Sequence, residues 1–283
     1  MILFSKMQGI GNDFIIINCI SQYFKYSLNS FSKYLCNRNF GVGADGVIYI
    51  FKSYYADCKI RIFNNDGTEA EMCGNGIRCV GKYLYEIGIV KQKNIKIETI
   101  IGTKDVELII ENKTVINVKV KMDRPSFELR RIPVYLPKEE MNKKVHSIKI
   151  LVDGEEYKFC LVSLGNPHAV CFVDDLKKIN LKKIGNIVEN YKYFPNKTNV
   201  EFVQIIDKKN IKIKVWERGV GETLACGTGA CAAVVTGVKN ELIDKNVIVE
   251  LDGGKLYIDW GEKEDDLYLT GECEFVYDGR LDL

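Results

Sequence analysis

Short runs of apolar residues recur along the whole chain at the length of β-strands. In residues 59–63 (KIRIF) the apolar positions alternate with a period of two, which places them on one face of a strand. In the first half such runs cover residues 15–17, 47–50, 59–63, 95–99 and 106–110. In the second half they cover residues 115–120, 157–162, 169–173, 200–205, 211–216, 247–251 and 267–270. The pattern predicts a strand-rich protein with two comparable halves.

Two helices are predicted with most support, and each follows a cysteine-glycine element. The sequence Cys-Gly-Asn-Gly at 73–76 leads into residues 77–87, and Cys-Gly-Thr-Gly at 226–229 leads into residues 230–238. Residues 230–234 are small and apolar all round, which is typical of a helix buried on every side. We therefore expect one buried central helix in each half.

The two cysteine-glycine elements form an internal repeat with a spacing of 153 residues. Glu69 stands four residues before Cys73, and Glu222 stands four residues before Cys226. We interpret the two glutamates as structural partners of the helix N-termini. The polar stretch 121–125 ends in Pro125, which disfavours both a helix and a central strand, so we place the joint between the halves there.

The composition excludes several classes of protein. The chain has 283 residues, of which 46% are hydrophobic, and its 40 basic residues are scattered among 38 acidic ones, so no nucleic-acid partner is predicted. Its apolar runs are far shorter than the roughly 20 residues of a membrane span, and residues 1–6 lack the features of a secretory signal. We expect a cytoplasmic protein without contact to a membrane, in which the ten cysteines are reduced.

A cysteine directly before a helix is a candidate for acid–base chemistry. The unpaired N–H groups of the first turn and the positive end of the helix dipole stabilise negative charge there, which lowers a thiol pKa from its ordinary value of about 8.5. The glycines let a ligand approach the same N–H groups, which can bind a carboxylate. We therefore predict that Cys73 and Cys226 are functional thiols.

Two such thiols, one from each half, fit the inversion of a carbon stereocentre. One group removes a proton from one face of the carbon, and the second delivers a proton to the other face. This scheme demands no cofactor. Zinc binding is disfavoured because Cys73 and Cys79, and likewise Cys226 and Cys231, are spaced too widely for a C-x2–4-C motif, and no metal site is predicted.

We interpret the other eight cysteines as small hydrophobic residues of the core, because free cysteine is among the most buried residue types. They are Cys19, Cys36, Cys58, Cys79, Cys160, Cys171, Cys231 and Cys273. Two alternatives to the stereocentre hypothesis remain. One is a different cysteine-pair isomerase or dehydratase, and the other is a non-catalytic thiol protein that binds metal or senses redox state.

Five segments give the chain a resemblance to the diaminopimelate epimerases, and they occur in that family's order. They are residues 7–14 (MQGIGNDF), 41–46 (GVGADG), 63–67 (FNNDG) with 73–79 (CGNGIRC), 165–168 (GNPH), and 216–223 (WERGVGET) with 226–229 (CGTG). The Cys-Gly-x-Gly element by itself also fits proline racemases and phenazine-biosynthesis-like isomerases of the same fold.

The resemblance implies a cofactor-independent epimerase that interconverts LL- and meso-2,6-diaminoheptanedioate on the path to lysine. Cys73 and Cys226 match the family's thiolate and thiol. Four residues match the backbone groups that bind the reacting carboxylate, namely Gly74, Asn75, Gly227 and Thr228. Six residues match side chains that hold the substrate, namely Asn12, Asn64, Asn166, Asn199, Glu217 and Arg218. His168 and Glu217 match groups that tune the protonation of the thiols.

Each of these polar residues also has an ordinary structural interpretation. Asn12 and Asn64 are typical turn residues, and His168 would serve as a hydrogen-bonded loop histidine. Glu217 and Arg218 would form a solvated strand end. Asn196 lies close enough in sequence to compete with Asn199 for its family position.

The resemblance also implies the architecture. We expect an α/β protein of the α+β type with two pseudo-symmetric domains, each a curled mixed sheet wrapped around a central helix, with the substrate in the cleft between them. The N-terminal domain would comprise residues 1–121 plus 272–283 and carry Cys73, and the C-terminal domain would comprise 122–271 and carry Cys226. We further expect a homodimer.

Overall fold

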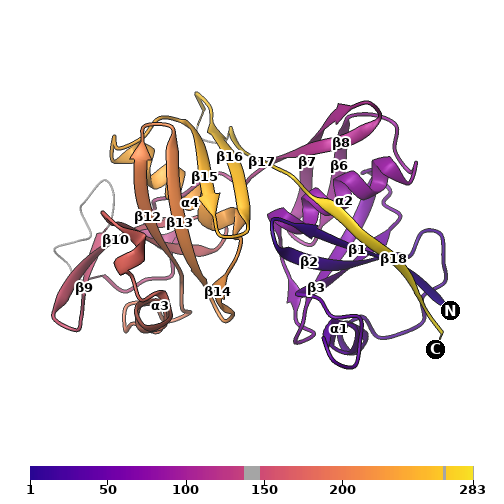
Figure 1. Ribbon diagram of the computed structural model, residues 1–283, viewed down its shortest axis with the longest axis horizontal. Coiled ribbons are helices and arrows are strands. Elements are labelled where there is room, and N and C mark those ends of the chain that lie inside the picture. The colour runs from indigo at the N-terminus through magenta and orange to yellow at the C-terminus, as the bar shows by residue number, and fades with distance from the viewer. Residues whose placement is uncertain (137–146, 264–265, 283) are drawn as a thin grey trace. The chain divides into compact units, whose positions relative to one another are not determined.

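The computed structural model describes residues 1–136, 147–263 and 266–282, and its chain divides into two compact units. Unit 1 comprises Met1–Lys121 and Thr270–Leu283, and unit 2 comprises Met122–Leu269. Figure 1 shows a twisted sheet and helices in each unit, and the described residues of each unit include two α-helices. The longest described helices have 13 residues, and none in the described part of the chain is long and apolar enough to cross a bilayer.

Unit 1 is a mixed sheet with one long and one short helix. Its strands are β1 (Ile2–Gly9), β2 (Asn12–Asn18), β3 (Gly46–Phe51), β4 (Cys58–Asn64), β5 (Glu69–Ala70), β6 (Asn94–Thr99), β7 (Gly102–Glu111), β8 (Thr114–Lys121) and β18 (Glu274–Leu281). Its helices are α1 (Leu28–Cys36) and α2 (Gly74–Glu86). The pairs β2–β3 and β4–β6 are parallel, and the other described pairs within the unit, including β1 with the C-terminal β18, are antiparallel.

Unit 2 has the same kinds of element. Its strands are β9 (Ser147–Val152), β10 (Glu155–Ser163), β11 (Pro167–Phe172), β12 (Asn199–Asp207), β13 (Asn210–Glu217), β14 (Gly221–Thr223), β15 (Asn246–Leu251), β16 (Gly254–Trp260) and β17 (Leu267–Gly271), which ends in unit 1. Its helices are α3 (Leu181–Glu189), α4 (Gly227–Lys239) and the short 3-10 turns η1 (Leu129–Arg131) and η3 (Leu176–Lys178). Here β11–β12 and β13–β15 are the parallel pairs.

The two units repeat one strand register. In unit 1, Phe63 of β4 pairs with Val47 and with Glu69, and in unit 2 Trp216 of β13 pairs with Val200 and with Glu222. Every residue of the second set lies 153 positions after its counterpart. The repeat seen in the sequence around the two cysteines therefore extends through the strands that precede each helix.

The long helix of each unit is buried by its own sheet. Residues 229–237 of α4 are all buried, which confirms the prediction of a helix enclosed on every side. This helix contacts β10, β11, β12, β13 and β16. In α2, residues 74–81 are buried and the helix contacts β1, β2, β7 and β8. Because small side chains line α4, its neighbours approach it closely, as Gly237 shows: a Cβ there would lie 2.6 Å from Ile243 Cδ1, in the turn after the helix, and 3.5 Å from Phe172 Cζ of β11.

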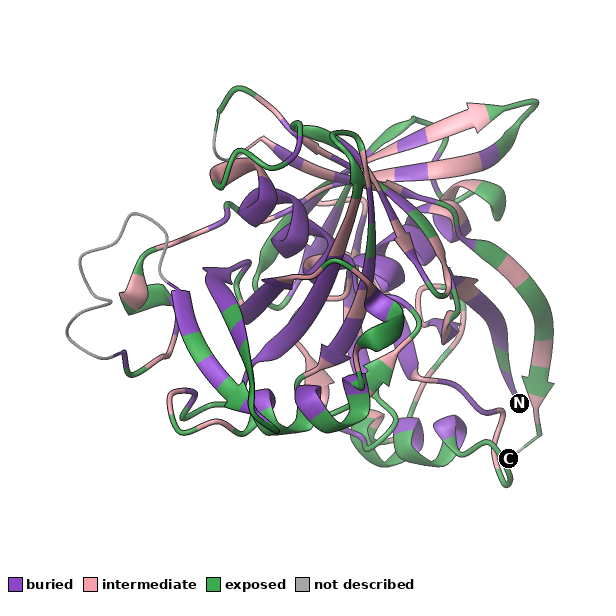
Figure 2. Cartoon of the chain, turned by 60° about the vertical axis from the view of Figure 1, so that its left-hand side comes forward, coloured by how far each residue is buried: buried purple, intermediate pink, exposed green. Residues whose placement is uncertain are grey.

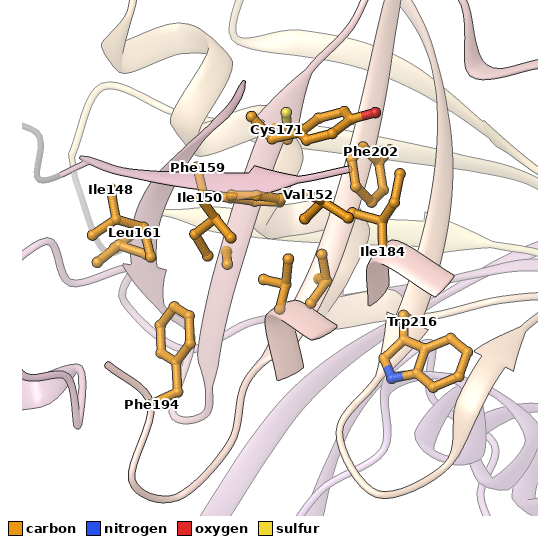
Figure 3. Close-up of a cluster of buried hydrophobic side chains, with 14 of the residues drawn as sticks. Ile148, Ile150, Val152, Phe159, Leu161, Cys171, Ile184, Phe194, Phe202 and Trp216 are labelled. Carbon is orange, nitrogen blue, oxygen red and sulfur yellow. The ribbon is translucent and has the colours of Figure 1, made fainter. Parts of the chain in front are cut away.

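A second apolar layer lies under the short helix of each unit. Figure 3 shows the cluster of unit 2, in which the side chains of β9, β10 and β12 gather with Ile184 of α3 and Trp216 of β13. Each fully buried aliphatic or aromatic side chain contributes about 1.5–3 kcal/mol relative to an exposed one. Figure 2 shows that α1 and α3 alternate buried and exposed residues, as surface helices do.

Most elements follow the predictions, and the exceptions have physical causes. All twelve predicted strands and both predicted helices are present. The sequence pattern did not predict α1, α3, β1, β5, β9, β14, β16 or β18. In β1 the polar Ser5 and Lys6 interrupt the apolar pattern, although both are buried. Ser5 bonds to Asp278, which lies far along the chain, and Lys6 pairs with Asp13 in the adjacent strand.

Candidate active site

Cys73 and Cys226 occupy the N-cap positions of α2 and α4. The Gly76 backbone N–H donates to Cys73 Sγ at 3.4 Å, and the Gly229 N–H donates to Cys226 Sγ at 3.3 Å. Both cysteines have extended backbone, as N-cap residues do. Each sulfur therefore lies at the positive end of a 13-residue helix, beside the first-turn N–H groups that the sequence analysis assigned to a carboxylate.

In unit 1, Cys73 is joined to Asn12 and Asn75. The Cys73 thiol donates to Asn12 Oδ1 at 3.7 Å, and Asn75 Nδ2 donates to the same oxygen at 3.2 Å. The Asn12 amide is fixed from its other end, because Nδ2 donates to Asp45 Oδ2 at 2.9 Å. The structure thus brings together three of the predicted residues and adds Asp45 as the group that orients Asn12.

Asp45 belongs to a network of charged groups. Arg38 donates to Asp45 and, with two nitrogens, to Asp13, which also pairs with Lys6 at 2.6 Å. Burial alone would raise the pKa of Asp13, but the hydrogen bonds from Arg38 and Lys6 outweigh it and lower the pKa to about 2. The Asp13 carboxylate therefore stays ionised, and this network holds the loop around residue 45 against the strand that carries Asn12.

Asn64 and Glu69 take local roles in unit 1. Asn64 is exposed at the end of β4, where its amide donates to Thr68 Oγ1 at 3.0 Å across a turn. Glu69 accepts two hydrogen bonds of 2.7 Å from Arg61 on the paired strand, and Glu222 is exposed. The interpretation of Glu69 as a partner of the helix N-terminus is therefore wrong, because Arg61 on the adjacent strand β4 bonds to both of its carboxylate oxygens.

In unit 2, a chain of polar side chains leads to Cys226. The Thr228 hydroxyl lies 3.5 Å from Cys226 Sγ, and Asn166 Nδ2 donates to that hydroxyl at 3.5 Å. His168 Nε2 lies 2.9 Å from Asn166 Oδ1, and His168 Nδ1 lies 2.7 Å from Glu201 Oε1. The side chains of His168 and Glu201 are completely buried. His168 is thus a buried residue of β11 and not a hydrogen-bonded loop histidine.

Asn199 and Arg218 lie on the adjacent strand ends. Asn199 is buried, with Nδ2 donating to the Pro167 carbonyl at 3.1 Å and Oδ1 accepting from the Arg218 backbone N–H at 2.9 Å. Asn196, the competing residue, is exposed. The Asn199 amide therefore fixes the start of the turn that carries Arg218, whose own side chain is exposed.

Glu217 is half-buried at the end of β13, and Thr223 Oγ1 donates to its Oε1 at 2.6 Å. Its carboxylate also influences the thiol of Cys226. Burial raises the pKa of Cys226 well above its ordinary value, and the charges of Glu217 and Glu201 raise it further, while Thr228 and the Gly229 N–H act in the opposite direction. The prediction of a pKa below the ordinary thiol value is wrong for Cys226, because desolvation and the two carboxylates outweigh the hydrogen bonds from Thr228 and the Gly229 N–H.

The remaining cysteines follow the core interpretation. All ten cysteines lie in the described part of the chain, and none of them forms a disulfide. Seven of the eight assigned to the core are buried, and Cys19 is half-buried and packs against the buried cluster of unit 1. Among residues 1–136, 147–263 and 266–282, no three histidine, cysteine or acidic side chains gather in a way that could hold a metal ion.

Comparison with known proteins identifies the family. The model of the diaminopimelate epimerase family matches residues 4–128 and 160–276. The diaminopimelate epimerase of Methanococcus maripaludis strain C5 is 44% identical over 280 residues, which cover 99% of both chains. The chain belongs to the diaminopimelate epimerase family. A second diaminopimelate epimerase, from Elusimicrobium minutum, is 46% identical over 276 residues, or 98% of both chains.

Comparison with a solved structure supports the fold class expected for this chain. A hydroxyproline epimerase from Agrobacterium vitis has a TM-score of 0.70, although only 14% of its residues are identical, over 98% of this chain and 91% of the other. The expected fold class is therefore confirmed. The segments matched by the diaminopimelate epimerase model include every site residue predicted from the sequence.

Sequence reasoning missed Glu201 and Asp45. In the sequence around Glu201, polar and apolar residues alternate in a way that favours the solvent side for a glutamate, and its partner His168 lies 33 residues earlier. The internal repeat contained the missing signal. The position 153 residues before Glu201 is Ile48, an apolar residue, so the repeat places Glu201 in the core.

Proposed function

We propose that this protein is a diaminopimelate epimerase that interconverts LL- and meso-2,6-diaminoheptanedioate in lysine biosynthesis, without a cofactor. The observation that carries the proposal is the pair of N-cap cysteines in a duplicated fold, within a chain that matches this family along its length. Localisation in the cytoplasm and assembly as a homodimer are part of the proposal.

The reaction removes one proton from the substrate Cα and adds one proton to its opposite face. A thiolate takes the proton from Cα, and the electron pair of the broken C–H bond remains on the carbon, delocalised toward the carboxylate. The second thiol then donates its proton to the opposite face of Cα and becomes the thiolate. The enzyme ends with the proton on the other sulfur, and the reverse reaction restores it.

The helix N-termini would supply electrostatic stabilisation. Negative charge grows toward the substrate carboxylate as the Cα proton leaves. The N–H groups of Gly74 and Asn75 in α2, and of Gly227 and Thr228 in α4, lie in the first turns, where the dipole favours negative charge. Donors that are already oriented stabilise such charge without reorganisation during the reaction.

The far end of the substrate is a second amino-acid group, and it would be held by ionic and amide contacts. Arg218 would bind its carboxylate in a bidentate manner, and Glu217 would attract its ammonium group. Asn64 and Asn166 would complete the site. Asn199 would act through the Arg218 backbone, to which it is bonded.

Deuterium incorporation separates this proposal from its alternatives. We expect the purified protein, incubated with LL-substrate in deuterated water free of metals and pyridoxal phosphate, to form meso product that carries deuterium at Cα. A proline racemase-like enzyme would instead act on proline or hydroxyproline. A thiol protein that only binds metal or senses redox state would leave both substrates without deuterium, and either result would refute the proposal.

A further inference from the structure

The buried carboxylate of Glu201 has no part in the mechanism described above, although it lies beside Cys226. A Cβ atom at Gly229 would lie 3.0 Å from Glu201 Oε1 and 3.3 Å from Cys226 Sγ. Only a glycine therefore separates the carboxylate from the sulfur. A fully buried carboxylate is costly unless it is paired, so its presence in the core calls for a function.

The partner of Glu201 is His168, and the pair has one consistent arrangement of protons. Because His168 Nε2 faces the acceptor Oδ1 of Asn166, that nitrogen carries a proton and donates it. The second proton of the pair lies between His168 Nδ1 and Glu201 Oε1, which are 2.7 Å apart. The pair is neutral as a whole, which suits a site where both side chains are completely buried.

The repeated fold contains its own comparison. In unit 1, Ile16 pairs with Ile48, and in unit 2 Val170 pairs with Glu201. Likewise Phe14 pairs with Gly46, and His168 pairs with Asn199. Ile48 and Phe14 are therefore the counterparts of Glu201 and His168.

Ile48 and Glu201 also pack against the same helix position. A Cβ at Gly76 in α2 would meet Ile48 Cδ1 at 2.9 Å and Phe14 Cζ at 3.6 Å, whereas a Cβ at Gly229 in α4 would meet Glu201. The fold therefore accepts an apolar pair below its cysteine helix. The polar pair of unit 2 is not required by the architecture.

We propose, on the basis of the function proposed above, that Glu201 is a positioning residue for catalysis, which acts through His168. Its carboxylate holds the imidazole with Nε2–H directed at Asn166 Oδ1. This bond fixes which end of the Asn166 amide faces Thr228, and so leaves the Thr228 hydroxyl available to donate to Cys226 Sγ when the sulfur is charged. Glu201 thereby sets the hydrogen bonding of one thiol and leaves the other thiol unaffected.

A double-mutant cycle tests whether Glu201 acts through His168. We compare Glu201→Ile, His168→Phe and the double variant, which recreates the apolar pair of unit 1. In the natural background Glu201→Ile is expected to lower kcat by about 10- to 100-fold with little change in KM, since a buried polar partner is lost. In the His168→Phe background the same substitution is expected to leave kcat unchanged and to raise the Tm, because it removes an unpaired buried carboxyl group.

The protonation of the two ring nitrogens of His168 provides a second measurement, which a purely structural role of Glu201 would not change. The chain has two histidines, so ¹⁵N-histidine spectra of the substrate-free protein can be assigned with a His146→Gln variant. We expect a protonated Nε2 and a low-field proton at the Nδ1 side of His168, which disappears in Glu201→Ile. Glu201→Gln, whose amide can still donate to Nδ1, should keep Nε2 protonated and regain part of the lost kcat.

Glu189→Gln is the matched control, because Glu189 is also a buried glutamate of unit 2 but bonds to Trp216 and the Gly219 N–H. It should leave the His168 spectrum unchanged. Independent, multiplicative losses of kcat in the cycle, an unprotonated Nε2, or a His168 spectrum that survives Glu201→Ile would each overturn the proposal. If Glu201→Ile does not fold, Glu201→Gln takes its place in the cycle. Failure of the proposed function would appear separately, as a natural protein that does not epimerise the substrate while its His168 spectrum is as expected.

Discussion

Cys73 and Cys226 hold the same position in two copies of one motif, and each sulfur accepts a hydrogen bond from the backbone N–H three residues later. Their surroundings differ. Cys73 is half-buried and bonds to Asn12, whereas Cys226 is buried next to Thr228 and close to two glutamates. The duplicated fold thus provides two equivalent helix termini and places its two thiols in unequal electrostatic environments.

The raised pKa of Cys226 predicts a thiol that stays protonated at neutral pH in the substrate-free protein. Alkylation requires the thiolate, so the rate of iodoacetamide labelling at Cys226, followed by peptide mass spectrometry, should rise only above the ordinary thiol pKa of about 8.5. Removing one of the two nearby charges should move this rise to lower pH, as in Glu217→Gln. A labelling rate that already levels off near pH 7 would contradict this prediction.

Arg218→Ala is expected to raise the KM for diaminopimelate by about 10- to 100-fold, because the substrate carboxylate loses a charged partner worth roughly 1.5–3 kcal/mol. Thermal stability should change little, since the Arg218 side chain is exposed. Asn199→Ala is the informative comparison. It removes the buried amide that accepts from the Arg218 N–H, so it should lower both kcat/KM and Tm. An unchanged KM in Arg218→Ala would show that this side chain does not bind the substrate.

Asp45→Ala should lower kcat/KM by about tenfold, because Asn12 would lose the acceptor that orients its amide toward Cys73. Steady-state kinetics with both substrate isomers measures the effect. Asp57→Ala serves as the control within unit 1, since Asp57 bonds to Gln92 and to the Lys96 N–H away from Asn12. Equal losses in the two variants would show that Asp45 acts only on stability.

The sequence pattern predicted the strands and the two cysteine helices because their signals are local. Alternation of apolar residues fixes the buried face of a strand, as in residues 59–63, and glycine after cysteine marks the start of α2 and α4. The helix α3 carries an equally local signal, with Leu181, Ile184 and Val188 on one face. It could have been predicted from that spacing.

The features that the sequence did not reveal depend on distant partners. Glu201 can be buried because it pairs with His168 on the neighbouring strand. Asp45 accepts a hydrogen bond from Asn12 and orients it across a parallel pair of strands. The state of the Cys226 thiol also depends on burial, which raises its pKa more than the hydrogen bonds from Thr228 and the Gly229 N–H lower it. Local patterns identified which residues gather around each cysteine, but tertiary packing decided how their charges balance.

The most direct test of the central claim is the epimerisation rate of Cys73→Ala and Cys226→Ala, with Cys79→Ala and Cys231→Ala as controls from the same two helices. The two-thiol account predicts that each N-cap variant folds but forms no deuterated meso product from LL-substrate in deuterated water, whereas both controls retain turnover. Continued turnover by either N-cap variant at a rate near that of the controls would contradict it.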